Sequence, residues 1–255
     1  MKCFSLKSFL VKSIAVVFIV LLFYTCSSNT ETENSDPHLE LIASYPLQID
    51  QPSGITFNGD FTFFWIVDGS KEKVYKTDLK GNILETLPYK GNDLEGICYD
   101  KNSNSLWLAE EELREVVQLD LNGNELARYK TGLTGSYNNG LEGIAIDESN
   151  NFFVLNEKNP KAIFALNKDF SVTKKIDLDF AEDLSDMYYN PESKNFFVLS
   201  DESKALYVWS LNDGPKTKFS LPFTKFEGIT ANPSANKIVL VNDSLDTMYE
   251  YELKQ

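Results

Sequence analysis

Three glutamates of this chain stand in the same local context, directly before a glycine and an isoleucine. They are Glu95, Glu142 and Glu227. Carboxylates that recur in one context can converge on a hard cation, and calcium takes roughly six to eight oxygen ligands in proteins. Zinc is disfavoured because His38, the one histidine, precedes the repeated segments and Cys98 is their one cysteine. These three glutamates are therefore candidate calcium ligands.

A second series of acids ends the next apolar run of each segment, and its members are Asp68, Glu110, Glu157, Asp201 and Asp243. Asp201 and Asp243 are added to the candidate calcium ligands, with Asn156, Asn242 and backbone carbonyls as neutral oxygen donors. A structural interpretation stays open, because four of the acids have a base a few residues later, namely Lys71, Arg114, Lys161 and Lys204. Each acid and base would then form an ion pair or cap a loop, and we assign Glu157 to this structural group.

An irregular loop at residues 131–140 offers a different kind of candidate. It contains Tyr137, Asn138 and Asn139 and leads directly to Glu142. An aromatic ring and two amides on a loop are suited to contact a ligand, and we group them with Asn156 as candidate ligand-binding residues. The same residues are also typical of an ordinary turn.

The elements that position these acids come from an internal repeat. Gly54, Gly96, Gly143, Asp186 and Gly228 occupy equivalent positions, with spacings of 42, 47, 43 and 42 residues. Each segment contains short apolar runs with the period of two that predicts β-strands, and four antiparallel strands make one propeller blade. The one long spacing is explained by the loop at 131–140. The sequence therefore predicts an all-β fold, a five-bladed β-propeller.

The fifth segment holds only three strands, and residues 38–46 form a strand without a partner at the other end of the repeats. We expect the propeller domain to span residues 38–255 and this N-terminal strand to close its last blade. The closure would cover an exposed edge of the sheet. A six-bladed ring is the alternative. In a four-stranded propeller blade, the innermost strand begins on the face where the second strand ends. Both series of acids should therefore lie at one mouth of the central channel.

The first 25 residues resemble a bacterial secretory signal, with three lysines before an apolar run at residues 14–24. The residues before Cys26 are similar to a lipoprotein signal, so Cys26 is a candidate for lipidation. Residues 26–37 would form a polar tether. This predicts a lipoprotein of the bacterial cell envelope, with the propeller outside the cytoplasm. An uncleaved signal anchor and ordinary signal cleavage are the alternatives.

Composition limits the partners and the chemistry. The formal net charge of −14 disfavours nucleic acid and anionic lipid surfaces and favours cations or basic proteins. A mechanism that needs a histidine base from the repeats is disfavoured. We expect a monomer that contacts the membrane through the lipid anchor and binds a protein or small molecule not identified by the sequence.

The repeated motifs resemble those of the SdiA-regulated, YjiK-like family of bacterial β-propellers. The resemblance rests on the segments at residues 93–97, 106–111, 140–145, 183–187, 198–203 and 226–229. It implies a membrane-associated propeller of the cell envelope with a phytase-like or calcium-linked character, and no settled reaction.

Three functions remain open at this point. The first is a calcium-binding propeller that holds a ligand or partner on its acidic face. The second is a metal-dependent phosphoesterase in which calcium bridges the substrate and an acid activates water. The third is a protein-interaction scaffold without catalysis. The fold does not choose among them.

Overall fold

The structure is a computed structural model that describes residues 36–136 and 139–254. The predicted signal peptide, Cys26, most of the predicted tether, Tyr137 and Asn138 lie outside the described residues. The described residues contain strands and turns, and none of them forms a helix long and apolar enough to cross a membrane.

Each of the first two blades follows the predicted order of four strands along the chain. Blade one consists of β2 (Pro52–Phe57), β3 (Phe64–Asp68), β4 (Lys73–Thr77) and β5 (Ile83–Thr86). Blade two consists of β6 (Leu94–Asp100), β7 (Ser105–Glu110), β8 (Glu115–Leu119) and β9 (Glu125–Lys130).

The next two blades repeat this order, and the fifth blade ends the ring. Blade three consists of β10 (Leu141–Ile146), β11 (Phe152–Asn156), β12 (Ala162–Leu166) and β13 (Val172–Asp177). Blade four consists of β14 (Asp186–Asn190), β15 (Asn195–Ser200), β16 (Ala205–Ser210) and β17 (Gly214–Ser220). Blade five consists of β18 (Phe226–Ala231), β19 (Ile238–Asn242), β20 (Thr247–Lys254) and β1 (His38–Pro46).

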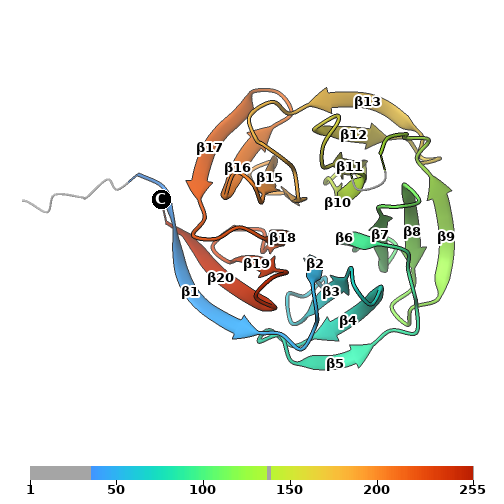
Figure 1. Cartoon of the computed structure of the whole chain (residues 1–255), viewed down its shortest axis with the longest axis horizontal. Helices are drawn as coiled ribbons and strands as arrows, with labels where there is room; N and C mark the ends of the chain where they lie inside the picture. Colours follow the sequence, from blue (N-terminus) through green and yellow to red (C-terminus); the bar gives the residue numbers. More distant parts are fainter. Residues whose placement is uncertain (1–35, 137–138, 255) are drawn as a thin grey trace, which may run out of the picture. The chain divides into compact units, whose positions relative to one another are not determined.

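The five sheets stand around a common centre, with β2, β6, β10, β14 and β18 innermost (Figure 1). β1 pairs antiparallel with β20, from His38 opposite Lys254 to Pro46 opposite Thr247. The N-terminal strand therefore closes the last blade, as the sequence predicts. The five-bladed prediction is confirmed, and the six-bladed alternative is wrong because every described strand belongs to one of five four-stranded sheets.

Apolar side chains pack between neighbouring blades rather than inside single sheets. Five hydrophobic clusters lie between successive pairs of blades, and one of them joins Trp65 and Val67 of blade one to Leu106 and Leu108 of blade two. All three tryptophans are buried in this way. The period of two in the sequence thus places alternate residues on the two faces of each sheet, and both faces meet a neighbour.

The glycine that repeats in the innermost strands allows those strands to approach closely. A Cβ atom added to Gly54 would lie 2.4 Å from the backbone oxygen of Glu95 on the next inner strand. Blade four has Asp186 at this position, and its Oδ2 accepts the Ile229 N–H at 2.9 Å. Packing around the channel therefore explains the recurring glycine, while the preceding residue is free to carry charge.

Candidate functional site

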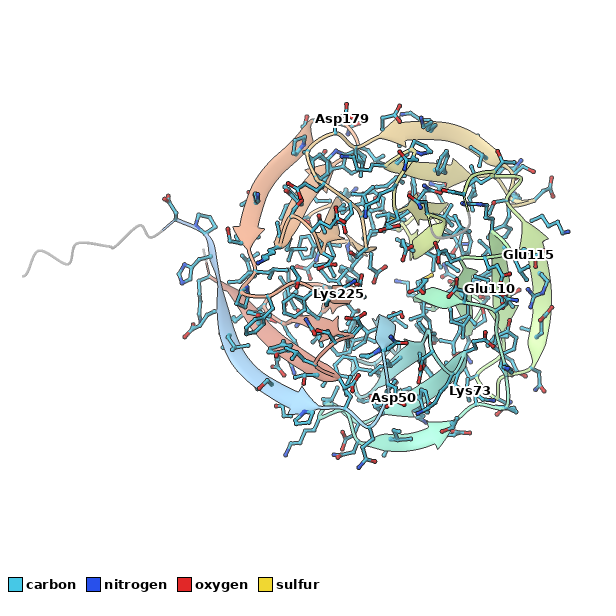
Figure 2. All side chains as sticks on the ribbon, in the orientation of Figure 1. Asp50, Lys73, Glu110, Glu115, Asp179 and Lys225 are labelled. Carbon is cyan, nitrogen blue, oxygen red and sulfur yellow. The ribbon has the colours of Figure 1, made fainter. Side chains whose placement is uncertain are left out.

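The innermost strands begin at a polar cavity of about 600 Å³, which we call the acidic mouth. Its lining combines backbone and neutral groups of Gln51, Ser53 and Gly69 with seven carboxylates and a single ammonium group. The charged residues are Asp93, Glu95, Glu111, Glu142, Glu157, Glu227, Asp243 and Lys225. Lys225 lies near the middle of the ring in Figure 2.

Most of the acids predicted as calcium ligands meet in this cavity. Glu95, Glu142 and Glu227 reach it from the starts of three inner strands, and Asp243 reaches it from the residue after β19. Asp201 does not line the cavity but contacts it through Lys225, whose Nζ lies 3.3 Å from Asp201 Oδ2. The same Nζ lies 3.2 Å from Glu227 Oε1.

Asp93, Glu95 and Glu111 form the tightest group of oxygens. One carboxylate oxygen from each lies within 4.8 Å of the other two. Calcium binds oxygens at about 2.3–2.6 Å, so two ligands on opposite sides of one ion are about 5 Å apart. The spacing of the three oxygens is therefore compatible with one calcium ion.

Asp93 and Glu111 were not among the acids predicted as metal ligands. Asp93 precedes the predicted ligand Glu95 by two residues, and Glu111 directly follows Glu110 of the second series. Their closeness in sequence to these acids was the signal that could have identified them. The fold brings them together because the Glu111 N–H donates to the Asp93 carbonyl at 2.9 Å. Glu111 Oε1 in turn accepts the Gly140 N–H at 2.8 Å, which holds its side chain at the mouth.

Burial and mutual repulsion shift the protonation of these acids. Burial, followed by the charges of Asp93 and Glu111, raises the pKa of Glu95 well above its ordinary value. Burial and the charge of Glu95 do the same to the pKa of Glu142. Burial raises the pKa of Glu111 to about 7 and that of Glu227 to about 7. The acidic mouth therefore retains protons near neutral pH, and a cation would compete with them.

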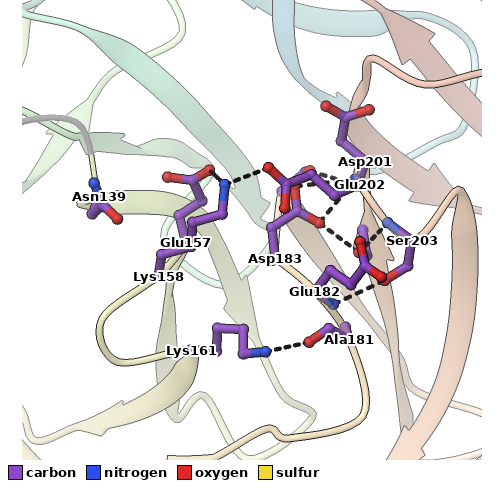
Figure 3. A network of polar contacts seen from close by, with 12 residues as sticks. Asn139, Glu157, Lys158, Lys161, Ala181, Glu182, Asp183, Asp201, Glu202 and Ser203 are labelled. Carbon is purple, nitrogen blue, oxygen red and sulfur yellow. Dashed lines mark hydrogen bonds and ion pairs between the residues drawn. The ribbon is translucent and has the colours of Figure 1, made fainter.

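Glu157 lies at the edge of the acidic mouth within a network of ion pairs (Figure 3). Lys158 Nζ lies 3.0 Å from Glu157 Oε1 and 2.8 Å from Glu202 Oε1, which links blades three and four. The base proposed from the sequence, Lys161, instead donates to the Ala181 carbonyl at 2.5 Å. Glu157 therefore has a basic partner, but this partner is Lys158 and not the predicted Lys161.

The other second-series acids have different local roles. Asp68 is fully buried and accepts the Lys71 backbone N–H at 2.7 Å, so it caps its loop. Glu110 is also fully buried, and Arg128 Nη1 lies 2.5 Å from its Oε2. The loop-capping alternative therefore describes Asp68, whereas Glu110 pairs with Arg128 rather than with the expected Arg114. The base that neutralises Glu110 thus comes from β9, two strands away.

The candidate ligand-binding residues do not line the acidic mouth, as far as the structure describes them. Asn156 is buried, its Nδ2 donates to the carbonyls of Lys158 and Pro160, and its Oδ1 accepts Arg114 Nη1 at 3.2 Å. Asn139 Oδ1 accepts Asn159 Nδ2 at 3.3 Å. The side chain of Asn156 is thus fully engaged within the protein.

The architecture and the cluster of acids define a five-bladed β-propeller with an acidic channel mouth. The model of the SdiA-regulated family matches residues 38–236, and the chain belongs to this family. No curated protein matches the sequence. The family match confirms the resemblance found in the repeated motifs.

Several solved lyase structures are similar in fold. A streptogramin B lyase is 16% identical, with a TM-score of 0.50 over 86% of this chain and 74% of that one. Virginiamycin B lyase from Staphylococcus aureus is 15% identical, with a TM-score of 0.51 over 78% of this chain and 80% of that one. A catalytically inactive variant of the Staphylococcus aureus lyase with quinupristin is 16% identical, with a TM-score of 0.52 and coverage of 82% and 83%. At these identities the likeness shows the fold alone.

Proposed function

We propose that this protein is a calcium-binding propeller of the bacterial cell envelope that holds a ligand or a protein partner at its acidic mouth. The observation that carries the proposal is the lining of one cavity by seven carboxylates and a single lysine. Half-buried carboxylates that repel one another destabilise a fold unless protons or a cation compensate them. Calcium suits this set because every side-chain donor among the acids is a hard oxygen.

Asp93, Glu95 and Glu111 would hold the ion, since their oxygens are the closest set. Three carboxylate ligands leave coordination positions for water or for oxygen atoms of a ligand. Glu142 and Glu227 line the same cavity and would add to the attraction for the cation. A ligand bound at the remaining positions would bridge the ion and the rim of the mouth.

Thermal unfolding in calcium and in EDTA tests the proposal. We expect calcium to raise the midpoint of the wild-type protein by several degrees, because an ion that binds only the folded state stabilises it. Glu95→Gln should remove most of that shift. Glu85→Gln, on the exposed outer strand β5, is the matched control and should keep it. An equal midpoint in calcium and EDTA for the wild type would contradict calcium binding and favour the scaffold.

A metal-dependent phosphoesterase is the second candidate, and Glu142 is the observation that favours it. Among residues 36–136 and 139–254, the carboxyl group of Glu142 has no hydrogen-bond or ion-pair partner, and burial together with the charge of Glu95 raises its pKa. A carboxyl group of this kind in a cavity with Lys225 is a candidate general base for activating water. Hydrolysis of p-nitrophenyl phosphate with calcium by the wild type and by Glu142→Gln tests it, and equal rates would reject the catalytic role.

We also propose that Cys26 carries the lipid that anchors the propeller to the membrane. The support is the lysine-rich start, the apolar run and the polar stretch after Cys26 in the sequence. Labelling with a palmitate analogue should mark the wild-type protein, whereas Cys26→Ser should lose the label and leave the membrane fraction. A label that persists in Cys26→Ser would reject this site.

A further inference from the structure

The innermost strands end at a second cavity, of about 210 Å³, which we call the aromatic mouth. Every blade contributes to it, and the strands that start at the acidic mouth run toward it. Five aromatic side chains line it, namely Phe57, Phe61, Tyr99, Tyr188 and Tyr189. The two ends of the channel therefore differ in chemistry, since one gathers carboxylates and the other gathers rings.

Phe61 places an aromatic ring at this cavity from a turn position whose backbone conformation suits asparagine better than phenylalanine. It lies in the turn between β2 and β3 with a φ of 56°, and the corresponding turns of the other four blades take the same conformation at Asn104, Asn150, Lys194 and Ala235. Asparagine tolerates positive φ much better than a bulky residue does. The Phe61 side chain also remains 38% exposed, although its ring packs 5.3 Å from that of Phe57.

Tyr188 supplies a hydrogen-bonding group inside the cavity. It also lines a smaller cavity of about 70 Å³ deeper in the channel. Its hydroxyl forms no hydrogen bond within residues 36–136 and 139–254, whereas Tyr99 donates to Asn104 Oδ1 at 2.7 Å and Tyr189 donates to Glu148. Burial raises the pKa of Tyr188, so the hydroxyl stays protonated at neutral pH. A free hydroxyl in an aromatic cavity can orient a ligand.

The charges around the aromatic mouth favour a cation over an anion. Three carboxylates line it, from Asp100, Asp147 and Glu148, against one ammonium group from Lys101. Lys194 lies 3.3 Å from Glu148 Oε1 and offsets part of this charge. The net charge of the whole chain is −14, which adds to the repulsion of anions.

We propose that the aromatic mouth binds a small aromatic cation, a single ring with an amino group. The rings of the lining can stack on the ring of such a molecule and make cation–π contacts with its ammonium group. The volume admits a one-ring compound and is smaller than the pockets that take drug-sized ligands. This site is independent of calcium binding at the acidic mouth.

A ligand-observed NMR titration with phenethylammonium tests the proposal on the protein in the form that the cell produces. We expect saturable binding, with 3-phenylpropanoate, its anionic counterpart, at least tenfold weaker. Phe61→Asn should weaken phenethylammonium binding about fivefold by removing an aromatic wall. Because asparagine suits the turn, the variant should unfold at a midpoint close to that of the wild type.

Phe223→Asn is the matched control, since Phe223 is also an exposed phenylalanine and does not line the cavity. It should leave the affinity for phenethylammonium unchanged. Absence of saturable binding would overturn the proposal, as would equal affinity for the anion. An equal loss of affinity in Phe61→Asn and Phe223→Asn would place the binding elsewhere and overturn it as well.

Discussion

Glu110 and Glu142 belong to neighbouring blades and have opposite electrostatic surroundings. Glu110 accepts the Tyr89 hydroxyl at 2.6 Å and the Asn92 N–H at 3.2 Å, in addition to its ion pair with Arg128. Glu142 has no such partner among the described residues, and burial together with the acids around it raises its pKa. Figure 2 shows Glu110 and Glu115 away from the centre of the ring, in blade two.

The difference separates acids that stabilise the fold from acids that are available for binding. A buried carboxylate with a cation and two neutral donors is compensated within the protein. A carboxylate surrounded by other carboxylates is compensated only by protons or by a bound cation. The first kind should matter for stability under all conditions, and the second should respond to pH and calcium.

The largest effect is expected when the compensated site loses its cation. Arg128→Met would leave Glu110 buried without its ion pair and should lower the free energy of unfolding by roughly 3 kcal/mol, as measured by urea denaturation. Lys130→Met is the control, because Lys130 is highly exposed and lies 3.8 Å from Glu115. A similar loss in the two variants would remove the distinction between a buried and a surface ion pair.

The stability of the calcium-free protein should fall as pH rises. Glu111 and Glu227 have pKa values of about 7 in the folded state, above the ordinary value of 4.5. The folded state thus binds more protons than the unfolded state between these values, and stability decreases across that range. Thermal unfolding in EDTA from pH 5 to pH 8 measures this. Calcium at pH 8 should reverse the loss, and a stability that rises with pH would contradict the assignment.

Removing one uncompensated charge should stabilise the metal-free protein. Glu142→Gln relieves repulsion at the acidic mouth, and we expect the free energy of unfolding at pH 8 in EDTA to rise by about 1 kcal/mol. Glu85→Gln should change it little, since Glu85 is exposed on β5. If Glu142→Gln instead destabilises the protein, Glu142 has a stabilising partner and belongs with Glu110.

The smallest effect is expected for the lysine of the acidic mouth. Lys225 pairs with Asp201 and Glu227 and repels a bound cation, so Lys225→Met should raise calcium affinity by about threefold. Calorimetric titration measures the change, and lower affinity in the variant would show that Lys225 supports the calcium site. Its half-exposed side chain keeps the expected change small, because water screens surface charges.

The fold was largely predictable because the internal repeat specifies the number and order of the blades. Gly54, Gly96, Gly143 and Gly228 mark the same position in four blades, and the steric contact at Gly54 explains why that position is small. The strand at residues 38–46 was predicted to close the ring because the last segment lacked one strand. Its pairing with β20 follows from the need to cover an edge of the sheet.

The candidate site was predictable only in part. The shared face of Glu95, Glu142 and Glu227 followed from the direction of the inner strands, and these acids do line one cavity. The pairing of Glu110 with Arg128 did not follow, because its partner lies two strands away. The aromatic mouth was also missed, since its rings come from blades one, two and four and share no motif.

The amino-acid sequence by itself determined the number of blades, the closing strand and the end of the channel at which the repeated acids gather. It does so because side chains alternate along a strand and each blade repeats after about forty residues. Only the tertiary structure decided which carboxylates are neutralised and which remain uncompensated. The reason is physical, since charges interact through space, and the nearest charge to an inner-strand residue belongs to another strand or another blade.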